Sequence, residues 1–265
     1  MPLAAGLYYF ANEEEDDWSR PAVILIHGAG GTHLNWPPEI RRMAGQRMYA
    51  LDLPGHGKSD GVGLHAIEDY ARAVLEFMDA LKIRKAVFVG HSMGGAIALY
   101  LGVHNPSRTL GLGLVATGPR LRVSPALLEK TSTPVTFVPA VEMINELFFS
   151  PHVDPRIKEV SGQRLAETRP TVLHGDFLAC DAYDEASLLG RVKAPALIIC
   201  GAEDKLTPMH LSEQLKARLK DSILYTIESA GHMVMLEEPQ KVSTTLQLFL
   251  NGIVYQPGEV ERLAA

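Results

Sequence analysis

Short apolar runs alternate with amphipathic stretches along much of the chain, a pattern typical of parallel βα units. Residues 22–28 (AVILIHG) and 47–55 (RMYALDLPG) each predict a buried strand that ends at glycine. Residues 65–81 place apolar side chains on one face of a helix, and a second helix is expected over 93–104. Further strands are expected within 85–90, 109–119, 195–204 and 222–232, and further helices near 208–219 and 239–251.

The alternation fails between residues 119 and 192, where prolines, scattered aromatic residues and short helical patterns replace it. No convincing buried strand is predicted there. We therefore expect a core domain built from residues 1–118 and 193–265, interrupted by an inserted lid over 119–192. The predicted core is an α/β domain with a doubly wound, mostly parallel sheet, and an insertion of this kind usually covers a site.

Composition narrows the choice of partners. The chain has 265 residues, a net charge of −6 and 46% hydrophobic residues, as in a globular protein. Negative charge disfavours nucleic acid and anionic membranes. No apolar run is long enough for stable membrane insertion, and the N-terminus lacks the pattern of a signal peptide. Cys180 and Cys200 are expected to be free thiols, which favours a cytoplasmic location. Composition and spacing leave the oligomeric state open.

Gly90-His91-Ser92-Met93-Gly94 fits the strand–turn–helix pattern G-x-S-x-G. A predicted strand precedes the motif and a predicted helix follows it. Glycines on both sides permit a tight turn that forces the serine into strained backbone angles. The alternative role, a serine that only caps a helix, does not require glycine at both positions. Ser92 is therefore the candidate nucleophile.

With this motif the chain resembles the α/β-hydrolase family, in which GHSMGG is similar to the nucleophile elbow of esterases and lipases. The resemblance covers nearly the whole chain, including an insertion between the sixth and seventh strands. It implies a catalytic serine, acid and histidine in that order along the chain. Serine in the nucleophile position disfavours the dehalogenase and epoxide-hydrolase branches, which use aspartate there.

The partners of Ser92 follow from chain order and loop position. His232 lies on a glycine loop between the last predicted strand and the last helix, which favours it as the base among ten histidines. His91 is expected to point away from the nucleophile, and His33 to approach the mouth of the site. Asp204 follows a buried strand and matches the family pattern G-x-x-D, so we expect it to orient His232. The neighbouring Glu203 is expected to be solvated.

The resemblance also implies an oxyanion hole made of two backbone N–H groups, those of Ala29 and Met93. Ala29 belongs to the glycine loop HGAGG. That loop lacks the third glycine of G-x-G-x-x-G, so a dinucleotide site is disfavoured. No cofactor is expected, because no metal-ligand spacing is present and triad chemistry needs none.

The predicted lid is rich in apolar residues, and four of them are candidates for contact with substrate. At helical spacing they line an acyl pocket or pack the lid onto the sheet, and packing is favoured for most apolar residues of the lid. The four candidates are Phe137, Val141, Ile144 and Phe148. The arginines of this segment follow no pattern that indicates an acidic substrate.

The predicted activity is hydrolysis of a small-molecule carboxylic ester of short to medium acyl chain through an acyl-enzyme. Three alternatives use the same fold. They are carbon–carbon bond hydrolysis of dienone acids, cofactor-free perhydrolysis, and a small-molecule receptor with very slow turnover.

Overall fold

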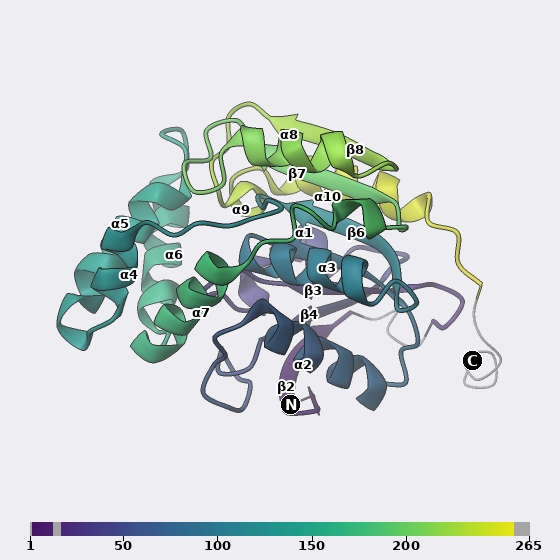
Figure 1. Ribbon diagram of the computed structural model, residues 1–265, viewed down its shortest axis with the longest axis horizontal. Helices are drawn as coiled ribbons and strands as arrows, with labels where there is room; N and C mark the ends of the chain where they lie inside the picture. Colours follow the sequence, from purple (N-terminus) through teal and green to yellow (C-terminus); the bar gives the residue numbers. More distant parts are fainter. Residues whose placement is uncertain (1, 13–16, 257–265) are drawn as a thin grey trace.

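A computed structural model describes residues 2–12 and 17–256 of the chain. Eight strands form one sheet in the order β1-β2-β4-β3-β5-β6-β7-β8 (Figure 1). The strands are β1 Leu3–Ala4, β2 Leu7–Ala11, β3 Ala22–Ile26, β4 Arg47–Leu51, β5 Ala86–His91, β6 Thr109–Val115, β7 Ala196–Gly201 and β8 Ser222–Ile227. The α-helices are α1 Pro38–Arg41, α2 Ile67–Ala80, α3 Met93–His104, α4 Pro125–Thr131, α5 Phe137–Phe148, α6 Pro155–Ala166, α7 Pro170–Ala182, α8 Met209–Arg218, α9 Val234–Glu237 and α10 Pro239–Asn251. The predicted α/β sheet is confirmed.

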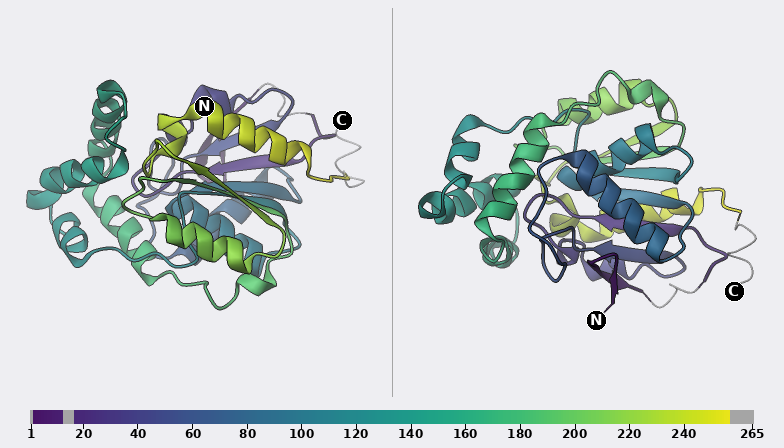
Figure 2. Two further views of the ribbon diagram at one scale, coloured as in Figure 1. Left: turned by 90° about the horizontal axis from the view of Figure 1, so that it is seen from above. Right: turned by 60° about the horizontal axis from the view of Figure 1, so that its bottom comes forward.

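Helices cover both faces of this sheet (Figure 2). Apolar residues of α2, α3 and α8 pack in one core cluster, and those of α1 and α10 pack in a second cluster on the other face. Every residue of β3, β5 and β7 is buried. Burial on both faces explains why these strands are continuous apolar runs rather than alternating ones.

An N-terminal hairpin extends the sheet, and the hydrophobic pattern did not predict it. β1 pairs antiparallel with β2, and β2 pairs antiparallel with β4, whereas β4 to β8 run parallel. The turn between β1 and β2 places Ala5 at φ 49° and Gly6 at φ 78°. Two successive positive φ values are typical of the type I′ turn that closes two-residue hairpins. Both strands are short and only partly buried, so their sequence carries little signal.

The chain between β6 and β7 forms four helices, α4 to α7, which project beyond the sheet at one side (Figures 1 and 2). We call residues 119–192 the helical insertion. It contains only an isolated β-bridge, between Arg120 and Asp184, besides its helices. Its helices lie against the carboxyl edge of the sheet, where the loops that follow the parallel strands begin.

In the two described segments, 2–12 and 17–256, no helix combines the length and apolar character that a membrane crossing requires.

Candidate active site

Ser92 occupies the sharp bend between β5 and α3, with φ 52° and ψ −116°. Few residues other than glycine adopt such angles, so the bend stores strain at the candidate nucleophile. The flanking glycines are required by close packing. A Cβ at Gly90 would lie 1.9 Å from the carbonyl oxygen of Gly94, and a Cβ at Gly94 would lie 2.2 Å from that of Ile26. The local sequence therefore holds a strained serine above the sheet edge.

The structure brings Asp204 and His232 together. Asp204 follows β7 and His232 lies in the loop after β8, so the pairing of these adjacent parallel strands places both loops at one edge. His232 Nδ1 lies 2.9 Å from Asp204 Oδ2, and both residues are buried. A proton on Nδ1 is donated to the carboxylate, which leaves Nε2 unprotonated and able to act as a base.

Asp204 is fixed by more than the histidine. The backbone N–H groups of Leu206 and Thr207 each donate to Oδ1 over 2.8 Å. The Thr207 hydroxyl donates to Oδ2 over 2.6 Å and lies 3.2 Å from His232 Nδ1. Burial alone would raise the pKa of Asp204, but His232 and these hydrogen bonds hold that pKa well below its usual range. Asp204 is therefore an ionised, immobile acceptor.

His91, expected to point away from the site, contacts His232 instead. Its Nε2 donates to the backbone carbonyl of His232 over 3.0 Å, and the two ring centroids are 4.8 Å apart. Burial, together with the nearby His232, lowers the pKa of His91 to about 3. A neutral His91 thus holds the loop that carries His232.

Two backbone N–H groups near Ser92 have no acceptor within the described part of the chain. They belong to Ala29, in the loop after β3, and to Met93, the first residue of α3. Both are the amides that the family resemblance assigned to the oxyanion hole. An amide that lies beside the nucleophile and has no acceptor is suited to receive a developing negative charge.

The helical insertion holds the loop that carries Ala29. The N–H of Gly30 donates to Asp176 Oδ2 over 2.8 Å, and the carbonyl of Gly30 accepts from the Thr168 hydroxyl over 2.9 Å. Asp176 is fully buried on α7 and also accepts from His56 Nε2 at 2.8 Å and from the Tyr70 hydroxyl at 2.6 Å. Burial opposes charge on His56, but the adjacent Asp176 raises the pKa of that imidazole. Asp176 therefore ties the insertion to the candidate oxyanion loop.

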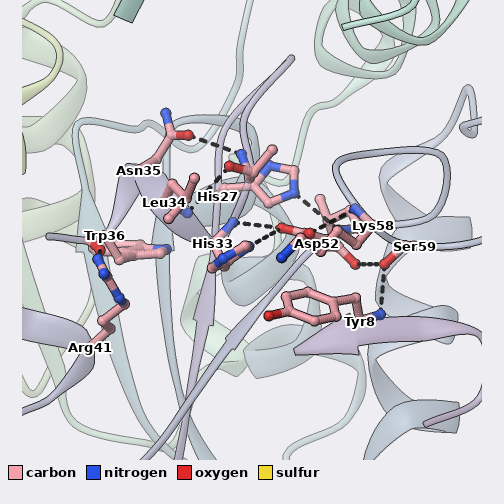
Figure 3. Close-up of polar contacts among 12 residues, drawn as sticks. Tyr8, His27, His33, Leu34, Asn35, Trp36, Arg41, Asp52, Lys58 and Ser59 are labelled. Carbon is pink, nitrogen blue, oxygen red and sulfur yellow. Dashed lines mark hydrogen bonds and ion pairs between the residues drawn. The ribbon is translucent and has the colours of Figure 1, made fainter. Parts of the chain in front are cut away.

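A second buried carboxylate supports the same loop from the side of β4 (Figure 3). Asp52 accepts from the backbone N–H and the Nδ1 of His33, over 2.7 and 2.8 Å, and from the N–H of Lys58 over 2.9 Å. Burial would raise the pKa of Asp52, yet the bonds from His33 and Lys58 lower it. His33, expected near the mouth, is thus a structural donor. Its neighbour His27 accepts from the N–H of Leu53 over 3.0 Å.

Ser92 and His232 line one cavity of about 490 Å³. Apolar residues from the helical insertion form much of its wall: Leu127, Leu147, Phe148 and Phe177. Ala29 and Phe148 also line a second cavity, of about 360 Å³, under α6. Phe148 further stacks against the His232 ring, with centroids 5.8 Å apart.

Of the four apolar candidates, only Phe148 lines these cavities. Phe137, Val141 and Ile144 are absent from both walls and lie in the core cluster that packs the insertion. Glu203 is about one-third exposed and lies 3.6 Å from His152. Among residues 2–12 and 17–256, no three His, Cys, Asp or Glu side chains are grouped to hold a metal ion.

Sequence reasoning missed Asp176, Thr207 and the role of His91. Asp176 lies 146 residues from Gly30 in the chain, and nothing around it marks it as a ligand of that loop. Thr207 is three residues after Asp204, directly after the turn in which the Asp204 side chain accepts from the backbone N–H of Leu206, two residues on. That spacing is a signal that was available.

Comparison with known proteins identifies the family of this fold. A family model described as the alpha/beta hydrolase fold matches residues 21–239. The chain is 30% identical to the 2-hydroxy-6-oxo-6-phenylhexa-2,4-dienoate hydrolase of Burkholderia cepacia, over 93% of this chain and 94% of that protein. It is 25% identical to 3-oxoadipate enol-lactonase 1 of Acinetobacter baylyi, over 88% and 90% of the two chains. A solved structure of a thermophilic esterase superposes with a TM-score of 0.80 at 32% identity, covering 94% of this chain and 95% of the other. On its sequence, sheet topology and elbow, this chain belongs to the α/β-hydrolase fold family.

Proposed function

We propose that the protein is a serine hydrolase that cleaves small carboxylic esters of short to medium acyl chain. Ser92 is the nucleophile, His232 the general base and Asp204 the residue that orients the histidine. The observation that carries this proposal is the 2.9 Å hydrogen bond from His232 Nδ1 to a buried, ionised Asp204, beside a cavity that Ser92 also lines. The protein belongs to the α/β-hydrolase fold family, and one structure similar to it is that of an esterase. Both findings support the assignment as a hydrolase.

The reaction proceeds in two halves. In the first, Ser92 Oγ bonds to the carbonyl carbon while its proton moves to His232 Nε2. The tetrahedral intermediate then collapses, the C–O bond to the alcohol breaks, and His232 returns the proton to the departing alcohol. In the second half, water gives a proton to His232 and attacks the acyl-enzyme, and the carboxylic acid is released with Ser92 restored.

Negative charge on the carbonyl oxygen is received by the N–H groups of Ala29 and Met93. Each such donor is worth about 3 kcal/mol of transition-state stabilisation in comparable enzymes. Because neither amide has an acceptor among the described residues, no hydrogen bond to them must break before the oxyanion forms. The 490 Å³ cavity, walled by Leu127, Leu147 and Phe177, sets the upper limit on acyl length, and the helical insertion serves as its lid.

The test measures turnover of p-nitrophenyl esters of increasing acyl length by the wild-type protein and by a folded Ser92→Ala variant. We expect sustained multiple turnover with an optimum at short or medium chains. The variant should lose about 10⁶ of the rate, as nucleophile removal does in a serine protease. Equal, slow hydrolysis by both proteins would reject the proposal and leave the carbon–carbon hydrolase and receptor alternatives.

Carbon–carbon hydrolysis is the second candidate, because a relative at 30% identity over 93% of the chain is named as a dienoate hydrolase. Activity on a saturated ester distinguishes the esterase from the carbon–carbon hydrolase. Efficient, Ser92-dependent hydrolysis of esters that lack a conjugated ketone supports the esterase assignment. Turnover confined to a vinylogous dienone acid supports the second candidate.

A further inference from the structure

Basic side chains gather on the wall of the cavity that holds Ser92, and none of the described residues that line it is an aspartate or a glutamate. The basic members are Arg120, Arg122, Lys205 and His210. The chain as a whole carries a net charge of −6, so this local excess runs against the composition. A local excess of positive charge on a cavity wall favours a negatively charged group in what enters that cavity.

Two neighbouring segments supply these groups. Arg120 and Arg122 follow β6, and Lys205 and His210 follow β7, which pairs in parallel with β6. Both segments therefore emerge at the same edge of the sheet as the elbow. They also touch, since a Cβ at Gly118 would lie 2.9 Å from the Cβ of Leu211. The basic groups thus form one rim, which we call the basic rim (Arg120, Arg122, Lys205 and His210).

Carboxylates near the basic rim neutralise only part of its charge. The guanidiniums of Arg120 and Arg122 each lie 3.6 Å from one carboxylate, that of Asp184. Arg122 is held in place because its Nη1 also donates to the backbone carbonyl of Asp181 over 2.6 Å. Lys205 has no hydrogen-bond or ion-pair partner within the described residues. The basic rim keeps a net positive charge, because Arg120 and Arg122 share the single carboxylate of Asp184 and Lys205 pairs with no carboxylate of the described residues.

We infer that the substrate is an ester whose acyl chain ends in a carboxylate, with that carboxylate bound at the basic rim. This inference rests on the proposed function and adds the substrate class to it. Apolar residues such as Leu127 and Phe177 contact the methylene chain. The side chains of Arg120 and Arg122 are more than half exposed, and a guanidinium group offers paired N–H donors to a carboxylate.

The experiment compares two methyl esters of equal length. Monomethyl adipate carries a terminal carboxylate, and its amide analogue, methyl 6-amino-6-oxohexanoate, has the same shape without the charge. Hydrolysis is followed by proton release at low ionic strength. We expect kcat/KM for the acid to exceed that for the amide roughly tenfold, because each exposed charge pair contributes a factor of about two to five. The ratio should fall as NaCl is raised, since exposed charges are screened.

Charge-neutralising variants locate the effect. Arg122→Gln and Lys205→Gln should each lower the acid-to-amide ratio about two- to fivefold, and the double variant should approach a ratio of one. Lys220→Gln is the matched control, because this exposed lysine lies before β8 at the opposite edge of the sheet. It should leave the ratio unchanged.

The outcomes separate the inference from the function on which it rests. Ser92-dependent hydrolysis of both esters at equal rates, with ratios unaffected by Arg122→Gln, overturns the inference and leaves the esterase assignment standing. Ser92-dependent turnover of p-nitrophenyl esters without hydrolysis of either adipate ester also overturns the inference alone. Absence of Ser92-dependent turnover of both the p-nitrophenyl and the adipate esters overturns the esterase assignment, and the inference with it.

Discussion

His91 Nε2 donates a hydrogen bond of 3.0 Å to the backbone carbonyl of His232, so the residue before the candidate nucleophile holds the loop of the candidate base. The ring is buried and neutral, and its Nδ1 has no hydrogen-bond partner among the described residues. One turn therefore positions both members of the reacting pair: Ser92 through its backbone, and His232 through the side chain of His91.

Replacing His91 tests this arrangement. His91→Leu removes the donor and leaves a buried carbonyl unpaired, which costs about 1–3 kcal/mol. We expect kcat to fall about tenfold with little change in KM, because the base loses its position rather than the site its substrate. His91→Gln keeps an N–H donor and should retain kcat within a factor of about three. Full kcat in the leucine variant would contradict the positioning role.

Asp176 offers a test of how the helical insertion supports the oxyanion loop. Asp176→Asn keeps the shape but turns one acceptor oxygen into a donor, against three donors from Gly30, His56 and Tyr70. Breaking such a buried pair costs about 3–5 kcal/mol. We expect the urea midpoint of unfolding of Asp176→Asn to lie below that of the wild type. We also expect a lower kcat, because the candidate oxyanion loop loses its support.

The matched control is Glu142→Gln, an exposed carboxylate on α5 of the same insertion. Its midpoint and kcat should equal those of the wild type. Equal stability of the Asp176→Asn and Glu142→Gln proteins would show that Asp176 does not hold the loop.

Strain at Ser92 predicts a trade between stability and activity. At φ 52° and ψ −116° a side chain costs about 1–3 kcal/mol, which glycine avoids. Glycine also gains entropy in the unfolded chain, which offsets about 0.5–1 kcal/mol. We expect inactive Ser92→Gly to be more stable than inactive Ser92→Ala by up to about 2 kcal/mol in urea denaturation. The reverse order would mean that the elbow is not strained.

Two buried histidines predict how stability depends on pH. Burial lowers the pKa of His27 to about 4 and that of His91 to about 3. Unfolded histidines titrate near 6.5, so below about pH 6.5 the unfolded chain binds protons that the native state does not. The free energy of unfolding should therefore fall as pH falls from 6.5 towards 4, by up to about 1.4 kcal/mol per pH unit for each histidine.

His56 acts in the opposite sense, because its pKa is raised. The stability that His56 contributes is fully present below pH 6.5 and is lost as pH rises through its folded pKa. His56 therefore does not change how the free energy of unfolding falls between pH 6.5 and 4. Urea denaturation at several pH values measures that slope. His91→Gln should reduce it by about 1.4 kcal/mol per pH unit, and an unchanged slope would contradict a neutral, buried His91.

Sequence patterns predicted the features that local geometry controls. The buried strands β3 and β5 are continuous apolar runs, and the ends of parallel strands meet at one edge, so the sequence alone predicts that Asp204 and His232 lie near Ser92. Contacts between distant segments left no such pattern. Gly30 meets Asp176 only because α7 folds back over the sheet edge.

The same limit applies to the wall of the cavity. Helical spacing placed Val141, Ile144 and Phe148 on one apolar face of α5, but spacing does not tell a core face from a cavity wall. In the structure, Phe148 reaches the cavity, whereas Val141 and Ile144 pack in the core. The basic rim was equally hidden, because Arg122 and Lys205 come from segments that meet only in the folded sheet.

The most direct test of the account is covalent labelling with a fluorophosphonate, read by intact mass and peptide mapping. Attack by Ser92 Oγ on phosphorus expels fluoride, and His232 takes the serine proton. We predict one adduct per chain, on the peptide that contains Ser92, with slow labelling in His232→Ala and none in Ser92→Ala. An adduct that maps elsewhere, or that persists in Ser92→Ala, would contradict the assignment of Ser92 as an activated nucleophile.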